Sequence, residues 1–265
     1  MSSAAPFQLQ AFASIVAVQA IAVFCVWWLH NRADLLKRYL GHAVSLAVGV
    51  LVATALLHLM PEAVAQLGDR PGIWIVFTCT LLLLFAIERI FSAITGNPAE
   101  TAATDALSTV HHHHGHHTTR PMNLVFGGML HSFLDGVSVA SAFTVGRRVG
   151  VLTALAITLH EIPHRLGDFA LFLHLRISPR RALHLATLVG VPSLLGVFLV
   201  TAVGHSGPEA TDWLLPISAA SFLYIASVNL MPELQHECRM PRVLSQLAAL
   251  AAGAALAATL AKLPV

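Results

Sequence analysis

Long apolar runs follow one another along the chain and are interrupted by short polar stretches. A helix needs about 20 predominantly apolar residues to cross the hydrocarbon core of a bilayer. Windows of that kind recur eight times, so we predict an all-α, polytopic membrane protein built as a bundle of eight transmembrane helices. The predicted spans are residues 8–30, 41–64, 72–94, 121–144, 149–174, 180–204, 212–232 and 241–262.

The composition agrees with a chain that lies mostly in lipid. Of 265 residues, 56% are hydrophobic and only 11% are charged, whereas soluble domains contain about 25% charged residues. The net charge of +2 and the lack of a basic cluster with interleaved aromatic residues argue against a nucleic-acid partner. The three cysteines lie far apart and form neither a CxxC pair nor a disulfide framework.

Basic residues between the predicted spans indicate the orientation. Lys and Arg are enriched in cytoplasmic loops, and the two sets of loops and span ends hold different numbers of them. We therefore expect an integral protein of the plasma membrane, or of a bacterial inner membrane, with both termini outside. The set placed in the cytoplasm holds Arg32, Lys37, Arg38, Arg89, Arg120, Arg176, Arg180, Arg181, Arg239 and Arg242, and the opposite set holds Arg70, Arg147, Arg148 and Lys262.

Residues 95–120 differ from the other segments between spans. They are rich in Ser, Thr and Ala, show no apolar period, and contain six histidines between positions 111 and 117. This composition predicts a disordered, His-rich cytoplasmic loop within a single transmembrane domain that covers residues 1–265. Its histidines either keep the loop solvated or collect metal ions weakly.

Ionisable side chains interrupt the fourth and fifth predicted spans. His131 and Asp135 are four residues apart and therefore share one helix face. His160, Glu161 and His164 lie at a similar depth in the next span, because a tight hairpin joins the two antiparallel spans. An Asp, Arg or Lys at membrane depth costs about 2.5–3.5 kcal/mol on insertion scales, so this constellation indicates a functional site.

The residue types in these spans favour a transition metal. Imidazole nitrogen and carboxylate oxygen together suit zinc and its first-row neighbours, whereas an all-oxygen set suits magnesium or calcium. The alternative is a hydrogen-bonded structural network, although three histidines and three acids on two adjacent spans are many for that role. In the second span, His58 is either a ligand at the outer edge of the site or an interfacial histidine.

Short motifs in four spans carry a family resemblance. The fifth span contains HEIPHRLGDFA (160–170) and the fourth HSFLDG (131–136), with LLHLMPEA (56–63) and FLYIASVNLMPEL (222–234) in two others. These motifs resemble those of the ZIP family of divalent-metal transporters, most closely the subfamily with an HEIPHELGD-type signature. The resemblance covers nearly the whole chain and implies one eight-helix bundle, often dimeric, so a homodimer is expected. It also implies movement of zinc, sometimes iron, manganese or cadmium, toward the cytoplasm through a site between spans two, four and five.

The resemblance implies roles for individual residues. It places Glu161 beside the primary ligands, toward a second metal position, and Asp168 fits equally as a partner of Arg165 or a residue of the ion path. The candidate metal-site residues are His58, His131, Ser132, Asp135, His160, Glu161, His164 and Asp168, and the resemblance implies primary ligands at His58, His131, Asp135, His160 and His164.

Three residues depart from the family pattern. Ser132 stands where the family usually has Asn, Arg165 where it usually has Glu, and Thr54 where related members often have an acid. A guanidinium stays charged and cannot bind a metal ion. We hypothesise that Arg165 replaces a second metal ion as a tethered cation, paired with Glu161 or Asp168. The alternative is that it repels incoming cations and that the protein transports poorly or only senses metal.

Two other functions share parts of this pattern. Residues 160–164 read HExxH, and Leu134-Asp135-Gly136 reads LDG, as in intramembrane zinc proteases. In those enzymes LDG should follow HExxH, but here it precedes, and Pro163 distorts the turn between the two imidazoles. We therefore predict a protein that is not an enzyme and has no cofactor, with the metal ion as transported substrate. A non-transporting metal sensor is the second alternative. For transport we expect passage by alternating access. The lack of a GK[ST] phosphate-binding loop argues against transport driven by ATP bound on this chain.

Overall fold

The computed structural model describes residues 4–29, 33–95, 121–174, 176–204, 208–235 and 238–260, nearly all of them helical. The predicted His-rich loop lies outside these residues, except for Thr95 at the end of a helix. The elements are α1 (Ala4–Leu29), α2 (Ala33–Thr54), the π-helical turn η1 (Ala55–Leu59), α3 (Met60–Leu67), α4 (Pro71–Thr95), α6 (Pro121–Val145), α7 (Arg147–His174), α8 (Pro179–Gly190), α9 (Pro192–Gly204), α10 (Pro208–Asp212), α11 (Leu214–Tyr224), the π-helical turn η3 (Ile225–Leu230), α12 (Met231–Leu234) and α13 (Met240–Leu260).

These elements form eight helical rods at the places of the predicted spans, because α2, η1 and α3 continue one another, as do α8 with α9 and α10 through α12. The all-α polytopic membrane fold is therefore confirmed. Among the described residues, six rods are long and apolar enough to cross a membrane. The other two, α6 and α7, are long enough but carry the ionisable residues singled out in the sequence.

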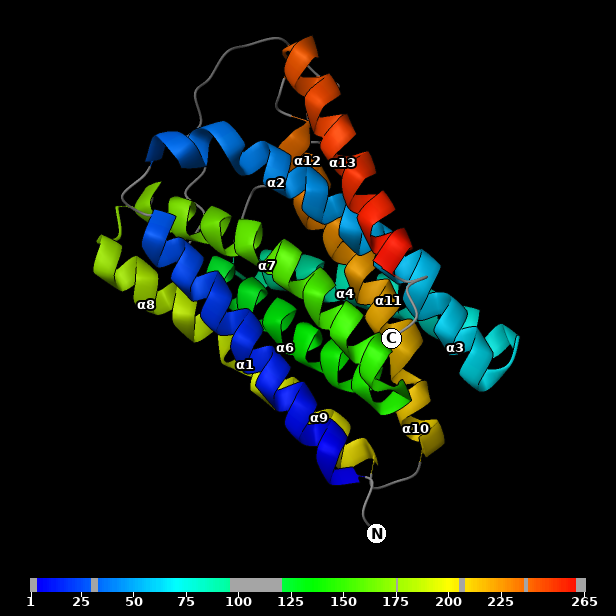
Figure 1. The fold of residues 1–265 in the computed structure, drawn as a ribbon. Coiled ribbons are helices and arrows are strands. Elements are labelled where there is room, and N and C mark those ends of the chain that lie inside the picture. Colours follow the sequence, from blue (N-terminus) through cyan, green and yellow to red (C-terminus); the bar gives the residue numbers. More distant parts are fainter. Residues whose placement is uncertain are drawn as a thin grey trace.

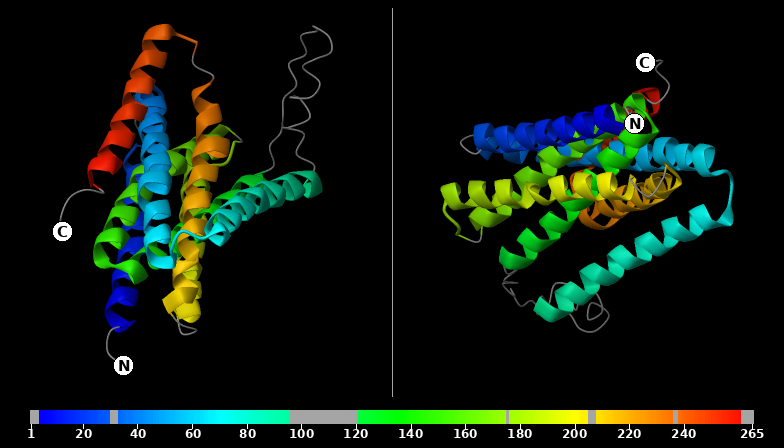
Figure 2. Two further views of the ribbon diagram at one scale, coloured as in Figure 1. Left: turned by 90° about the vertical axis from the view of Figure 1, so that its right-hand side faces the viewer. Right: turned by 90° about the horizontal axis from the view of Figure 1, so that it is seen from below.

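The two polar rods lie inside the bundle (Figure 1). α6 packs against α7, α9, α1 and α11, and α7 packs also against α1 and α2. Helix α4 runs along the outside (Figure 2), where it contacts chiefly α11 and where the Tyr224 hydroxyl donates a 2.5 Å hydrogen bond to Glu88. The surrounding helices thus shield the polar residues of α6 and α7 from lipid, as buried charge in a membrane requires.

Two helix pairs pack backbone against backbone at glycines. A Cβ atom on Gly136 of α6 would overlap the carbonyl oxygen of Ser193 in α9. In the same way, a Cβ on Gly49 of α2 would overlap the carbonyl oxygen of Leu250 in α13. Because glycine has no side chain, the helix axes in these two pairs approach more closely than other residues allow.

The two π-helical turns occur at related sequences. Both η1 and η3 run directly into a Leu-Met-Pro-Glu stretch, at residues 59–62 and 230–233. Proline lacks the N–H that an α-helix needs, and a widened turn before it changes which carbonyl groups are bonded. α7 instead continues through Pro163 as one helix from Arg147 to His174.

Candidate metal centre

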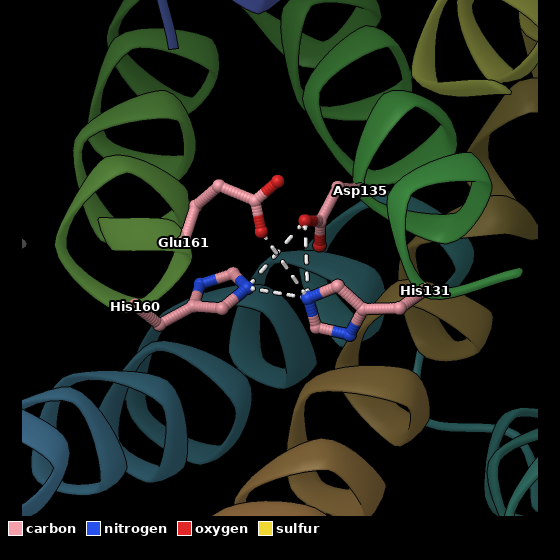
Figure 3. Close-up of side chains that lie close together, drawn as sticks. All are labelled: His131, Asp135, His160 and Glu161. Carbon is pink, nitrogen blue, oxygen red and sulfur yellow. Dashed lines mark hydrogen bonds and ion pairs between the residues drawn. The ribbon is translucent and has the colours of Figure 1, made fainter. Parts of the chain in front are cut away.

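Four buried side chains from α6 and α7 converge on one point. His131 and Asp135 project from α6, and His160 and Glu161 project from α7 toward them (Figure 3). Each offers one nitrogen or oxygen atom, and these four atoms lie within 4.8 Å of one another. His131 is 4% exposed, and the other three residues are fully buried. Two imidazoles and two carboxylates so placed could hold a metal ion of the zinc class.

The distances show that the four groups face one another. His160 Nε2 lies 3.1 Å from His131 Nε2 and 3.4 Å from Asp135 Oδ2. His131 Nε2 lies 3.5 Å from the same Asp135 oxygen and 3.6 Å from Glu161 Oε2. Neither Asp135 oxygen, nor Glu161 Oε2, has a hydrogen-bond partner among the described residues. Buried acceptors without donors are rare and costly, so their convergence favours a site for a cation.

The ring of His160 is oriented by its own helix. Its Nδ1 lies 3.3 Å from the carbonyl oxygen of Ala156, one turn earlier in α7. A proton on Nδ1 that is donated to this carbonyl leaves the Nε2 lone pair facing the other three residues. The backbone therefore supports the tautomer that a metal ligand needs.

His164 and Asp168 form a second layer beside the four residues. The His164 ring stacks on the ring of His131, with centroids 4.3 Å apart and planes 8° apart. Its Nδ1 lies 3.4 Å from Asp168 Oδ2. Among the described residues, the carboxylate of Asp168 therefore faces His164, while Arg165 pairs with Glu161 instead.

Ser132 lies against Arg165, whose Nη2 donates to its hydroxyl oxygen at 2.6 Å. Gln19 of α1 accepts another hydrogen bond from the same Nη2, at 3.2 Å. Gln19 lies in none of the motifs that predicted the site. An amide in the middle of the otherwise apolar first span was the signal that could have identified it.

The structure does not bring His58 into the cluster of four. His58 lies in η1 and lines a separate cavity with Thr54, Ala156, Leu159 and residues of α13. Its buried Nε2 has no hydrogen-bond partner among the described residues. Ala156 connects the two places, because its side of α7 lines the cavity and its carbonyl oxygen contacts His160.

Fold and geometry together define a class: an all-helical membrane protein with a buried histidine–carboxylate cluster between two central helices. The family model described as ZIP zinc transporter matches residues 5–261. The chain belongs to the ZIP zinc transporter family.

Relatives of known name agree with this assignment. The chain is 32% identical to the zinc transporter ZIP13 of Pongo abelii over 231 residues, covering 81% of this chain and 65% of the relative. It is 30% identical to ZIP13 of Homo sapiens over 262 residues, covering 81% and 68%. The zinc transporter SLC39A7 of Rattus norvegicus is 34% identical over 142 residues, covering 51% and 30%. The chain thus spans about two thirds of the length of the ZIP13 relatives. The family suggests a transporter.

Proposed function

We propose that this protein carries a divalent transition-metal ion, zinc before iron, manganese or cadmium, across the membrane toward the cytoplasm. The observation that carries the proposal is the convergence of His131, Asp135, His160 and Glu161 at one buried point. In a chain of the ZIP family, a buried site of this chemistry is best explained as the place where the ion is held during passage.

The donor set suits an ion that must be released again. It combines neutral imidazoles with carboxylates and contains no thiolate, the ligand that soft metal ions bind most firmly. The four residues come from α6 and α7, so a displacement of either helix would change the number of ligands on the ion. Alternating access of this kind exposes a mid-membrane site first to one side and then to the other.

The direction of transport follows from the predicted orientation. With the basic loops in the cytoplasm, both termini and the turn between α6 and α7 lie outside. The ion enters from that side and leaves toward the side of the His-rich segment. Residence in a plasma or bacterial inner membrane and assembly as a homodimer stay predictions.

Zinc uptake into proteoliposomes tests the proposal. We expect saturable uptake by the intact protein and its loss in His160→Ala, which removes an oriented ligand. His184→Ala is the matched control, because His184 is exposed on α8 and should leave uptake unchanged. Competition by iron, manganese and cadmium ranks the ions. Zinc binding by the purified protein without any flux would contradict transport and indicate a metal sensor.

A further inference from the structure

Arg165 is a charged side chain that is almost completely buried, at 1% exposure, beside the candidate metal centre. Its guanidinium contacts four residues, one from each of the helices α1, α6, α7 and α8. Nε and Nη2 contact Glu161 Oε1 at 2.7 and 2.6 Å, and Nη1 donates to the carbonyl oxygen of Ala186 in α8 at 3.1 Å. With the bonds from Nη2 to Ser132 and Gln19, the fork of donors is nearly saturated.

These bonds divide the two oxygens of Glu161. Both Arg165 contacts go to Oε1, whereas Oε2 has no hydrogen-bond partner among the described residues and faces His131 Nε2 at 3.6 Å. A guanidinium that grips one carboxylate oxygen fixes the direction of the other. Glu161 is therefore held so that a single oxygen points at the four-residue cluster.

The space beside Oε1 is shaped to hold the guanidinium. A Cβ atom on Gly190 would collide with the Gln19 side chain and lie 3.3 Å from Arg165 Nη2. Ser132 has a short side chain that ends in an acceptor at hydrogen-bond distance. Two of the three residues that depart from the family pattern, Ser132 and Arg165, are thus the two ends of one hydrogen bond.

The charges limit how many divalent ions this pocket accepts. Asp135 and Glu161 supply two negative charges, and Arg165 offsets one of them. One divalent ion at the cluster then leaves a net charge of +1 with neutral histidines. A second ion on Oε1 would have to occupy the volume of the guanidinium or sit against its charge at a few ångströms, where repulsion is strong in a buried site.

We propose that Arg165 is a built-in cation on the Oε1 side of Glu161, so that the site holds one divalent ion, bound through Oε2 alone. This inference rests on the proposed function, because it takes the four-residue cluster as the place where the transported ion binds. Arg165 is a positioning residue: it acts on the ion through Glu161 and through its charge.

Counting bound zinc tests the proposal. The background is the full chain with the histidines between positions 111 and 117 replaced by Gln, so that the His-rich segment adds no ions. After equilibrium dialysis, we expect one zinc per chain in this background and two in Arg165→Glu, which puts a carboxylate where the cation stood. Arg147→Glu makes the same charge change at an exposed position of α7 and should stay at one.

Affinity separates the charge of Arg165 from its packing. Arg165→Lys keeps the charge, so the Kd for zinc should change by less than about threefold. Arg165→Gln removes the charge and should lower the Kd for zinc by about tenfold or more, because the repulsion between the guanidinium and the ion is lost. A residue that only filled space or tied helices together would shift both variants alike. This comparison also decides the matter if Arg165→Glu does not fold.

Each result has one consequence. Two ions in the background protein, one ion in folded Arg165→Glu, or equal effects of Lys and Gln would overturn the proposal. One bound ion without flux in proteoliposomes leaves it standing while the transport function fails. If the background protein binds no zinc at all, both fall.

Discussion

Two helix pairs in this protein are packed closely at glycines, but the close packing has a different role in each pair. α6 meets α9 at Gly136, and α2 meets α13 at Gly49, in both cases with backbone against backbone. Yet α6 carries His131 and Asp135 in the buried centre, whereas α13 packs almost only on α2 and only 6% of its apolar stretch is buried. Close packing of α6 on α9 therefore helps to position the residues of the candidate metal centre, whereas close packing of α2 on α13 attaches a peripheral helix to the bundle.

The largest effect is expected for Gly136→Ala. The added Cβ would overlap the backbone of Ser193, which cannot turn aside as a side chain could, so α6 and α9 must separate. Overpacking of this kind costs about 1–3 kcal/mol or more, and Gly136 directly follows Asp135. We expect a lower thermal unfolding temperature in detergent together with lost zinc binding in the background without loop histidines. Unchanged zinc affinity would show that the site does not depend on the α6–α9 contact.

A similar loss of stability with a different consequence is expected for Gly49→Ala. Its Cβ would overlap the carbonyl oxygen of Leu250, so α13 must move away from α2. None of the four clustered residues lies in either helix, and zinc affinity should remain within about threefold of the parent while unfolding costs about 1–3 kcal/mol less. A fall in affinity as large as that of Gly136→Ala would remove the distinction between the two pairs and would implicate the cavity around His58.

The smallest effect is expected for Gly127→Ala, the control on α6 itself. Beyond its chain neighbours and its own helix backbone, a Cβ atom there would meet no atom of the described residues within 4 Å, and the residue is exposed. Alanine is the better helix former by about 1 kcal/mol at most, so stability should stay level or rise slightly and zinc binding should not change. Thermal unfolding and dialysis measured beside Gly136→Ala check this. A loss comparable with that of Gly136→Ala would mean that any change in α6 disturbs the site.

The sequence predicted the spans and the face-sharing pairs, because bilayer thickness sets the length of a span and helical geometry sets the i, i+4 spacing. His131 with Asp135 needed nothing more. The sequence could not predict the partner of Arg165, because its spacing allowed both Glu161 and Asp168. The choice between them depends on how α1, α6 and α8 pack around the guanidinium. His58 was placed on the right rod, but the π-helical turn around it changes the helical register by one residue, about 100° of rotation, which spacing alone does not show.

The polar character of α6 and α7 has a consequence for how the protein is made. Among the described rods, these two are the ones outside the six membrane-crossing candidates, and Gly146 is the single residue between them. An isolated α7 would bring Glu161, Arg165 and Asp168 into lipid at a cost of several kcal/mol. If α6 and α7 insert together as a hairpin, His131 and Ser132 of α6 enter the membrane beside the charged residues of α7. Gln19, which accepts a hydrogen bond from Arg165, is inserted earlier with α1. We therefore expect the two central helices to insert into the membrane as one unit and to pack against α1, which is already inserted.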